Sequence, residues 1–187
     1  MFTTAINAIP LRFEAAPSLF SPNDIDAGTR AMLGCAVFSP EDKVLDLGCG
    51  YGPVGIYAAK VIGEANVTMC DIDPLAVQLS VSNAALNDVP GVRVLQSDGL
   101  RGIDAAGYTL ILCNPPYHTD FSLAKHFIEK GFNRLAIGGR MMLVTKRLEW
   151  YRNKLAAIFG GVRVREVDGY YVMTAEKRGR DYAARKR

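Results

Sequence analysis

Between residues 44 and 159 the sequence alternates short apolar runs with stretches of helical period. Strands are expected at residues 44–47, 67–70, 92–96, 109–113 and 140–145. Helices are expected from about Pro53, from about Pro74, and over residues 121–136 and 148–159. Runs such as Leu110-Ile111-Leu112 are apolar without alternation, which indicates strands covered on both faces. The sequence therefore predicts an α/β fold with a mostly parallel sheet and helices on both of its faces.

The end of the chain departs from this rhythm. Two strand-like segments, residues 162–167 and 170–174, are separated only by Asp168-Gly169, a pair typical of a two-residue hairpin loop. We therefore expect a seven-stranded sheet with one antiparallel hairpin strand at its edge. At the other end, residues 1–22 are expected to be irregular, and residues 24–38 to form a helix capped by Asn23 or Asp24.

Length and composition favour one domain. The chain has 187 residues and 49% hydrophobic content, so we expect a single domain over residues 1–176 and a basic tail over residues 177–187. The tail could bind a phosphate backbone or could be a solvated end.

The sequence has no bilayer-spanning apolar run and no signal-peptide pattern, which predicts a cytoplasmic protein. Four cysteines without a CxxC pair, together with two histidines, predict no metal site.

A glycine-rich segment, Asp46-Leu47-Gly48-Cys49-Gly50-Tyr51-Gly52, follows the first expected strand of the sheet. Glycines let the main chain turn and approach a ligand closely, at the strand ends where open α/β sheets bind ligands. The acidic residue before the glycines, and the lack of a Lys-Ser/Thr pair after them, argue against a P-loop. These features predict a site for a nucleoside-type ligand.

Carboxylates follow the next two expected strands. Asp71 could accept hydrogen bonds from ribose hydroxyls. Asp98 could accept one from an adenine amino group, although Asp98-Gly99 could also be a simple turn. Asp73 is expected to be the N-cap of the helix that starts at Pro74.

The fourth expected strand ends in Asn114-Pro115-Pro116-Tyr117. An amino group on a planar base is a poor nucleophile because its lone pair is delocalised. The Asn114 side-chain oxygen and a prolyl carbonyl could accept its two hydrogens and direct the lone pair at an electrophile. Tyr117 could stack on a planar substrate. The motif could also merely end a strand, but its position after a nucleoside-type site predicts a catalytic role.

These motifs resemble those of class I S-adenosylmethionine-dependent methyltransferases, and specifically the bacterial ribosomal RNA guanine-N2 methyltransferases. The resemblance extends to His118 after the asparagine motif, to residues 20–29 (FSPNDIDAGT) and to Leu148-Glu149-Trp150-Tyr151. It implies a Rossmann-like class I methyltransferase fold, S-adenosylmethionine as cofactor and no metal. The cofactor-binding residues would be Asp46, Gly48, Cys49, Gly50, Asp71, Ile72, Asp98, Gly99 and Asn114. The catalytic residues would be Asn114, Pro115, Pro116 and Tyr117.

The resemblance also implies RNA as the partner, either ribosomal RNA or the ribosomal subunit, with the target base single-stranded or flipped out. Well-known members of the family carry a second, degenerate methyltransferase-like domain that helps to bind RNA, whereas here only the irregular segment of about twenty residues is expected before the catalytic part of the domain. The basic residues Arg140, Lys146, Arg147 and Arg152 are expected near the active edge, where they could contact phosphates.

Several alternatives remain open at this point. Asp26 and Thr29 could lie near the amino-acid end of the cofactor or could simply belong to the first turn of a helix. The asparagine motif would also suit a glutamine-N5 protein methyltransferase, because a side-chain amide presents a similar planar nitrogen. A non-catalytic cofactor- or RNA-binding module is the third possibility.

Overall fold

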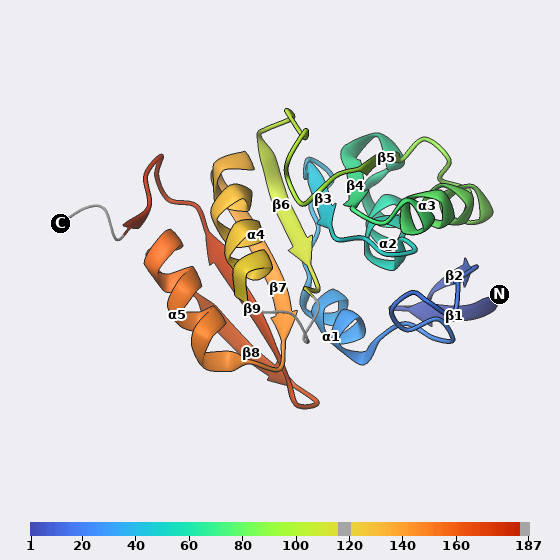
Figure 1. Ribbon diagram of the computed structural model, residues 1–187, viewed down its shortest axis with the longest axis horizontal. Coiled ribbons are helices and arrows are strands. Elements are labelled where there is room, and N and C mark those ends of the chain that lie inside the picture. The colour runs from blue at the N-terminus through green and yellow to red at the C-terminus, as the bar shows by residue number, and fades with distance from the viewer. Residues whose placement is uncertain (116–120, 184–187) are drawn as a thin grey trace.

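In the computed structural model, which describes residues 1–115 and 121–183, a seven-stranded sheet forms the centre of the protein (Figure 1). Its strands are β3 (Val44–Leu47), β4 (Val67–Asp71), β5 (Arg93–Gln96), β6 (Tyr108–Cys113), β7 (Leu135–Thr145), β8 (Arg163–Val167) and β9 (Tyr170–Glu176). Their order across the sheet is β5-β4-β3-β6-β7-β9-β8. The neighbours from β5 to β7 are all parallel, which confirms the mostly parallel sheet.

The C-terminal hairpin is confirmed, but its antiparallel strand does not lie at the edge. β9 pairs antiparallel with β7 on one side and with β8 on the other, so β8 forms the edge. The apolar content of the two strands explains this order. Val172 and Met173 of β9 are buried, whereas Arg163 and Arg165 of β8 are exposed. The more apolar strand takes the inner position, and the expectation of an antiparallel edge strand is wrong.

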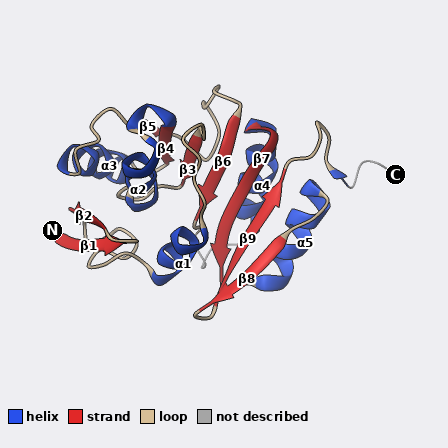
Figure 2. Cartoon of the chain, turned by 180° about the vertical axis from the view of Figure 1, so that it is seen from behind, coloured by secondary structure: helices blue, strands red, loops and turns tan. Residues whose placement is uncertain are grey.

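Helices cover both faces of the sheet (Figure 2). On one face lie α1 (Ala27–Cys35), α2 (Pro53–Ile62) and α3 (Pro74–Leu86), and on the other α4 (Phe121–Arg134) and α5 (Leu148–Phe159). Adjacent residues of β6 serve different layers: Leu110 packs with the first group and Ile111 with the second. Burial on both faces explains why this strand reads as a continuous apolar run. Among the described residues, no helix is both long and apolar enough to cross a membrane.

Part of the N-terminal segment that was expected to be irregular is a β-hairpin. β1 (Phe2–Ile6) pairs antiparallel with β2 (Ile9–Phe13), and Leu11 and Phe13 of β2 are completely buried. The connecting residues Asn7 and Ala8 both have positive φ, at 47° and 66°. A turn of this kind usually carries a glycine, and its absence here removes the sequence signal for a hairpin. The expectation is therefore wrong for these residues.

Two buried amides of α3 and its C-cap hold this hairpin against the rest of the fold. Asn87 accepts a hydrogen bond from the Arg12 N–H at 3.0 Å and donates one to the Arg12 carbonyl at 2.7 Å. Asn83 makes the same pair of contacts with Glu14, both at 2.8 Å. The two side chains lie one helical turn apart, so they act as a short strand edge for β2.

The first helix starts later than expected. α1 begins at Ala27, and its N-cap is Asp26, whose Oδ2 accepts a hydrogen bond from the Thr29 N–H at 3.1 Å. Asp24 does not cap the helix because its carboxylate pairs with Arg30 at 2.7 Å. The expected cap at Asn23 or Asp24 is therefore wrong.

The start of the expected basic tail is part of the folded domain. Lys177 is only 8% exposed, and its Nζ donates a hydrogen bond to the Leu135 carbonyl at 2.8 Å. Burial lowers the pKa of Lys177. Tyr182 donates a hydrogen bond to the Glu129 carbonyl at 3.1 Å. This segment follows β9, whose last residue, Glu176, lies opposite Arg140 in the antiparallel pairing with β7. The segment therefore leaves the sheet at the end that is far from the carboxyl end of β7. Residues 184–187 lie outside the described part of the chain.

Candidate active site

A cavity of about 360 Å³ opens at the carboxyl ends of β3, β4 and β6. It is walled by the segment before α1, by the glycine-rich loop, by the residues that follow β4, β5 and β6, and by α4. Aspartates predominate among its charged lining residues: Asp26, Asp46, Asp71, Asp73 and Asp98. None of the lining residues in the described chain is a lysine, arginine or histidine. The cavity is therefore electronegative and suits a cationic ligand.

Asp46 lies at the bottom of this cavity and is the most deeply buried of its carboxylates, with 2% exposure. Its Oδ2 accepts a hydrogen bond from the Gly55 N–H at 2.8 Å. Burial raises the pKa of Asp46 to about 7, and the nearby Asp71 charge adds to the increase, although the bond from Gly55 opposes it. A cationic group that enters the cavity would favour the ionised form of Asp46.

The glycine-rich loop is fixed by the end of β4. The N–H groups of Gly48 and Cys49 both donate to the Cys70 carbonyl at 2.9 Å, with Gly48 at a φ of 75°. The Gly50 N–H donates to Asp71 Oδ2 at 2.8 Å. These contacts bring the loop and Asp71 together at one side of the cavity, as the sequence predicted. They also show that Asp71 supports the loop, a role that its position in the sequence does not reveal.

Asp73 has the structural role that was expected for it. Its side chain accepts a hydrogen bond from the Leu75 N–H at 2.9 Å and caps α3. Asp71 Oδ1 in turn accepts from the Asp73 N–H at 3.0 Å. Ile72, between the two, lines the cavity with 61% of its surface exposed.

Asp98 and Gly99 lie at the rim of the cavity after β5. Asp98 is exposed and pairs with Arg101 at 2.6 Å, so it does not depend on a ligand for a partner. Gly99 allows close packing, because a Cβ atom there would lie 3.0 Å from the ring of Phe127. Phe127 lines the same cavity from α4. Sequence analysis did not identify it, since it reads as one more apolar position on an amphipathic helix.

Asn114 stands at the other side of the cavity, directly after β6. Its Nδ2 donates hydrogen bonds to Asp26 Oδ2 at 3.0 Å and to Thr29 Oγ1 at 2.9 Å. Pro115 is buried and also lines the cavity. The described chain thus brings Asn114 and Pro115 into the cavity that Asp46 and the glycine-rich loop also line. Pro116, Tyr117 and His118 lie outside the described residues.

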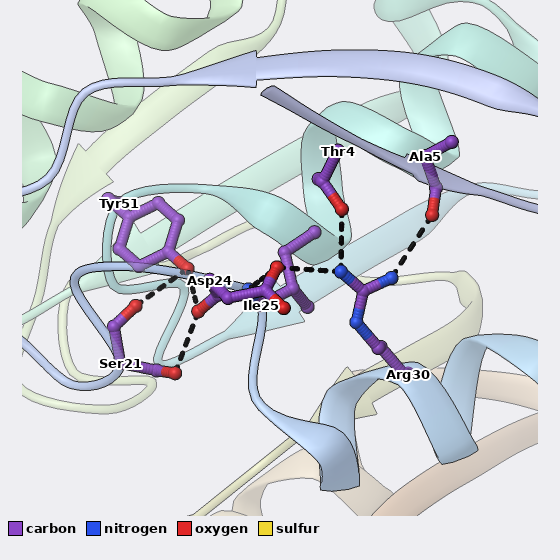
Figure 3. Close-up of polar contacts among 7 residues, drawn as sticks. All are labelled: Thr4, Ala5, Ser21, Asp24, Ile25, Arg30 and Tyr51. Atoms are coloured by element: carbon purple, nitrogen blue, oxygen red, sulfur yellow. Dashed lines mark hydrogen bonds and ion pairs between the residues drawn. The ribbon is translucent and has the colours of Figure 1, made fainter. Parts of the chain in front are cut away.

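The segment before α1 is tied to both the hairpin and the glycine loop (Figure 3). Arg30 donates to the Ala5 carbonyl at 3.1 Å and to Thr4 Oγ1 at 2.6 Å, besides its ion pair with Asp24. The Tyr51 hydroxyl lies within hydrogen-bonding distance of the Ser21 and Asp24 carbonyls, at 3.2 and 3.3 Å. These contacts hold the segment that carries Asp26 over the cavity.

Of the basic residues expected near the active edge, Lys146 and Arg147 follow the carboxyl end of β7. Both are exposed, and each lies over an aromatic ring: Lys146 Nζ is 4.7 Å from the centroid of Tyr170, and the Arg147 guanidinium is 5.1 Å from that of Phe121. The Phe121 ring stacks on Trp150 with centroids 4.3 Å apart.

The other two basic residues are engaged elsewhere. Arg152 pairs with Glu149 at 2.5 Å. Arg140 pairs with Asp42, which precedes β3, at 3.5 Å, and donates to the Val37 carbonyl at 3.2 Å. Arg140 therefore lies toward the amino end of the strands, and its expected place at the active edge is wrong. The expectation was wrong because Arg140 begins the strand expected at residues 140–145, whereas the active edge lies at the other, carboxyl end of that strand.

The sheet order, the glycine-rich loop after β3 and the asparagine after β6 define a class I methyltransferase fold. The chain belongs to the methyltransferase small domain family, whose model matches residues 10–174. It is 31% identical over 172 residues to the uncharacterized protein YbxB of Bacillus subtilis, covering 88% of this chain and 85% of YbxB. It is 33% identical over 181 residues to ribosomal RNA small subunit methyltransferase C of Pseudomonas putida, covering 93% of this chain and 53% of that protein.

A solved structure shows the same arrangement. The 16S rRNA N2 methyltransferase RsmC of T. thermophilus, in complex with AdoMet and guanosine, superposes with a TM-score of 0.86 at 27% identity. The match covers 95% of this chain and 50% of that one. The chain therefore spans about half the length of these two rRNA methyltransferases, but most of the length of YbxB.

Proposed function

We propose that this protein transfers the methyl group of S-adenosylmethionine to an exocyclic amine, and that the acceptor is guanine N2 in ribosomal RNA. The observation that carries the proposal is that Asn114 and Pro115 line the same acidic cavity as Asp46 and the glycine-rich loop. The relative in T. thermophilus was solved with AdoMet and guanosine, which supports both the cofactor and the acceptor.

The lining of the cavity fits S-adenosylmethionine. This cofactor carries a sulfonium and an ammonium group, and the lining carries aspartates without a lysine or arginine among the described residues. Asp71 would accept hydrogen bonds from the ribose hydroxyls, and Asp98 would accept one at the rim from the adenine amino group. Cys49, Ile72, Gly99 and Phe127 would contact the apolar parts of the ligand.

The chemical step would depend on how the acceptor amine is held. When bound, S-adenosylmethionine supplies a methyl group attached to a sulfonium sulfur. The Asn114 side-chain oxygen and the Pro115 carbonyl would accept the two amine hydrogens, so that the nitrogen lone pair points at the methyl carbon. The C–N bond forms as the C–S bond breaks and its electron pair returns to sulfur. The amine then loses one proton to water, so no general base is needed.

Lys146 and Arg147 would bind the RNA backbone beside the target base. Both follow β7, the neighbour of the strand that carries Asn114, and neither pairs with a carboxylate among the described residues. Aromatic rings beside exposed cations are typical of surfaces that bind single-stranded nucleic acid. This favours RNA over a protein glutamine as the acceptor. The base would be single-stranded or flipped out to reach Asn114.

The proposal is tested by incubating the protein with isotopically labelled S-adenosylmethionine and unmodified ribosomal subunits or their naked RNA. Digestion to nucleosides and mass spectrometry should then reveal labelled N2-methylguanosine. Label in adenine or in protein glutamine would overturn the acceptor but keep the enzyme class. Cofactor binding without any transfer would favour a non-catalytic module.

A further inference from the structure

We propose that Asp26 and Thr29 are positioning residues that lock the side-chain amide of Asn114 in one of its two orientations. The locked orientation turns Nδ2 toward α1 and directs Oδ1 away from it, to the side where the amine to be methylated would bind. This inference rests on the proposed function, because it assigns to Asn114 the task of accepting a hydrogen bond from that amine.

The geometry of the contacts supports the lock. A primary amide nitrogen has two hydrogens, and both of those on Asn114 are engaged, one by Asp26 Oδ2 at 3.0 Å and one by Thr29 Oγ1 at 2.9 Å. Oxygen and nitrogen lie on opposite branches of the planar amide, so fixing the nitrogen also fixes the direction of the oxygen. All three side chains line the cavity.

The carboxylate is the group that selects the orientation. An ionised carboxylate only accepts hydrogen bonds, so a flipped amide would set its oxygen against Asp26 Oδ2. The Thr29 hydroxyl can donate as well as accept, and it would tolerate either orientation. Asp26 therefore decides which end of the amide faces α1, and Thr29 adds a second bond that holds it there.

Asp26 is itself held in place from several sides. Its Oδ2 also accepts from the Thr29 N–H at 3.1 Å, as the N-cap of α1. The residues on either side are anchored by the ion pair of Asp24 with Arg30 and by the bonds from Arg30 to β1. An acceptor fixed in advance costs little to organise in the transition state, which is the advantage of such a lock.

The decisive experiment exchanges the two side chains. Asn114→Asp should lower kcat roughly 100-fold, because two carboxylates would then face each other. For comparison, removal of one oxyanion-hole donor typically lowers kcat by about 10²–10³. Adding Asp26→Asn should restore activity at least about tenfold over Asn114→Asp alone, because the new amide at position 26 can donate to the carboxylate introduced by Asn114→Asp. The cap of α1 is weakened in this variant, since the atom that turns its N–H toward residue 114 is the one that accepts from the Thr29 N–H in the wild type. If the double variant is no more active, although both variants fold and bind S-adenosylmethionine, the lock is refuted.

Thr29 offers a matched pair of variants. Thr29→Val keeps the shape but removes the acceptor, and it should lower kcat about three- to tenfold with little change in KM, as expected for loss of one hydrogen bond. Thr29→Ser keeps the hydroxyl and should restore most of that loss. The main-chain N–H that caps α1 is present in both, so a purely structural role would not separate them. Equal kcat values in the two variants would count against the lock.

A readout that needs no substrate separates this inference from the proposed function. In the ligand-free protein, the two Asn114 Nδ2 protons should exchange slowly with water in ¹H–¹⁵N spectra, and Asp26→Ser with Thr29→Val should make them exchange rapidly. Serine keeps the cap of α1 but does not reach Asn114. Unchanged exchange would overturn the lock, whatever the acceptor proves to be. If instead the acceptor is not guanine but the exchange result holds, only the proposed substrate fails.

Discussion

The two halves of the active edge differ in charge and in depth. On the side of β3, β4 and β5, aspartates line a cavity and Asp46 is almost completely buried. On the side of β7 and β9, Lys146 and Arg147 are exposed above aromatic rings. One half therefore suits a small cation and the other a large anion, with Asn114 on the strand between them. If the proposed function is correct, this contrast keeps the cofactor and the RNA on separate sides of the edge.

The largest effect is expected at the boundary between the halves. Asn114→Ala should lower methyl transfer roughly 10²–10³-fold, the range typical of a lost transition-state hydrogen bond. Its dissociation constant for S-adenosylmethionine should stay within a few-fold of the wild-type value, because the aspartates remain. Transfer of labelled methyl groups and calorimetric binding measure the two quantities. Asn66→Ala, an exposed site on another part of the surface, serves as the control. Activity within a few-fold of wild type would refute the role of Asn114.

The acidic half is tested through Asp46. Its pKa of about 7 means that the ligand-free protein holds a proton that the unfolded chain, with an ordinary value of 3.8, has already lost by about pH 5. The free energy of unfolding should therefore fall as pH rises from about 4 to about 7, and Asp46→Asn should remove that decrease.

Cofactor affinity should have the opposite dependence on pH. A bound cation favours ionised Asp46, so affinity should rise from about pH 5.5 to about 7.5, by at most about tenfold per pH unit for a single proton. Asp46→Asn should show a flat profile and bind about tenfold more weakly at about pH 8, equal to roughly one pKa unit of coupling. Calorimetry across this pH range measures both. A wild-type profile that is already flat would mean that the cation does not interact with Asp46.

The basic half is tested by reversing one charge. Arg147→Glu should weaken RNA binding and lower the slope of log affinity against log salt by about 1 to 2, because one phosphate contact is lost and a repulsive charge is added. Arg93→Glu, an exposed residue of β5 at the far edge of the sheet, is the matched control and should leave the slope nearly unchanged. Filter binding over a range of salt concentrations distinguishes them. Equal slopes for the two variants would remove the basic half from the RNA interface.

The smallest effect on catalysis is expected away from both halves. Asn87→Ala should lower the free energy of unfolding by about 1–3 kcal/mol, because the main-chain groups of Arg12 lose a buried partner. Its kcat should not change, since Asn87 does not line the cavity. Urea denaturation and a transfer assay give the two values, with Asn66→Ala again as the control. A loss of kcat without a loss of stability would show that the hairpin acts on the site directly.

Local patterns were enough to predict most of the sheet. The unbroken apolar runs located β3 and β6, and Asp168-Gly169 located the final hairpin. What failed depended on contacts between distant residues. Both β8 and β9 could pair with the free edge of β7, and the more apolar strand, β9, takes that position. The N-terminal hairpin has no glycine in its turn, and part of its pairing comes from the amides of Asn83 and Asn87.

The candidate site shows the same division. Asp46, the glycine loop and Asn114 could be predicted because each lies at or just after the carboxyl end of a strand, and parallel strands end at one edge. The contacts of Asn114 with Asp26 and Thr29 could not, since they join residues that are 88 and 85 positions apart. Phe127 was missed for another reason: on a helix, an apolar residue that lines a cavity has the same periodicity as one in the core.

The inner position of β9 has a consequence for synthesis of the chain. β7 lies next to β6, but its other edge is paired only by β9, which begins at Tyr170. On a growing chain, β3, β4, β5 and their helices can assemble early, while β7 keeps an unpaired apolar edge until the last strand has emerged. An unpaired edge of this kind is a template for aggregation. A nascent chain that stalls between Thr145 and Tyr170 would therefore keep this apolar edge of β7 open to aggregation.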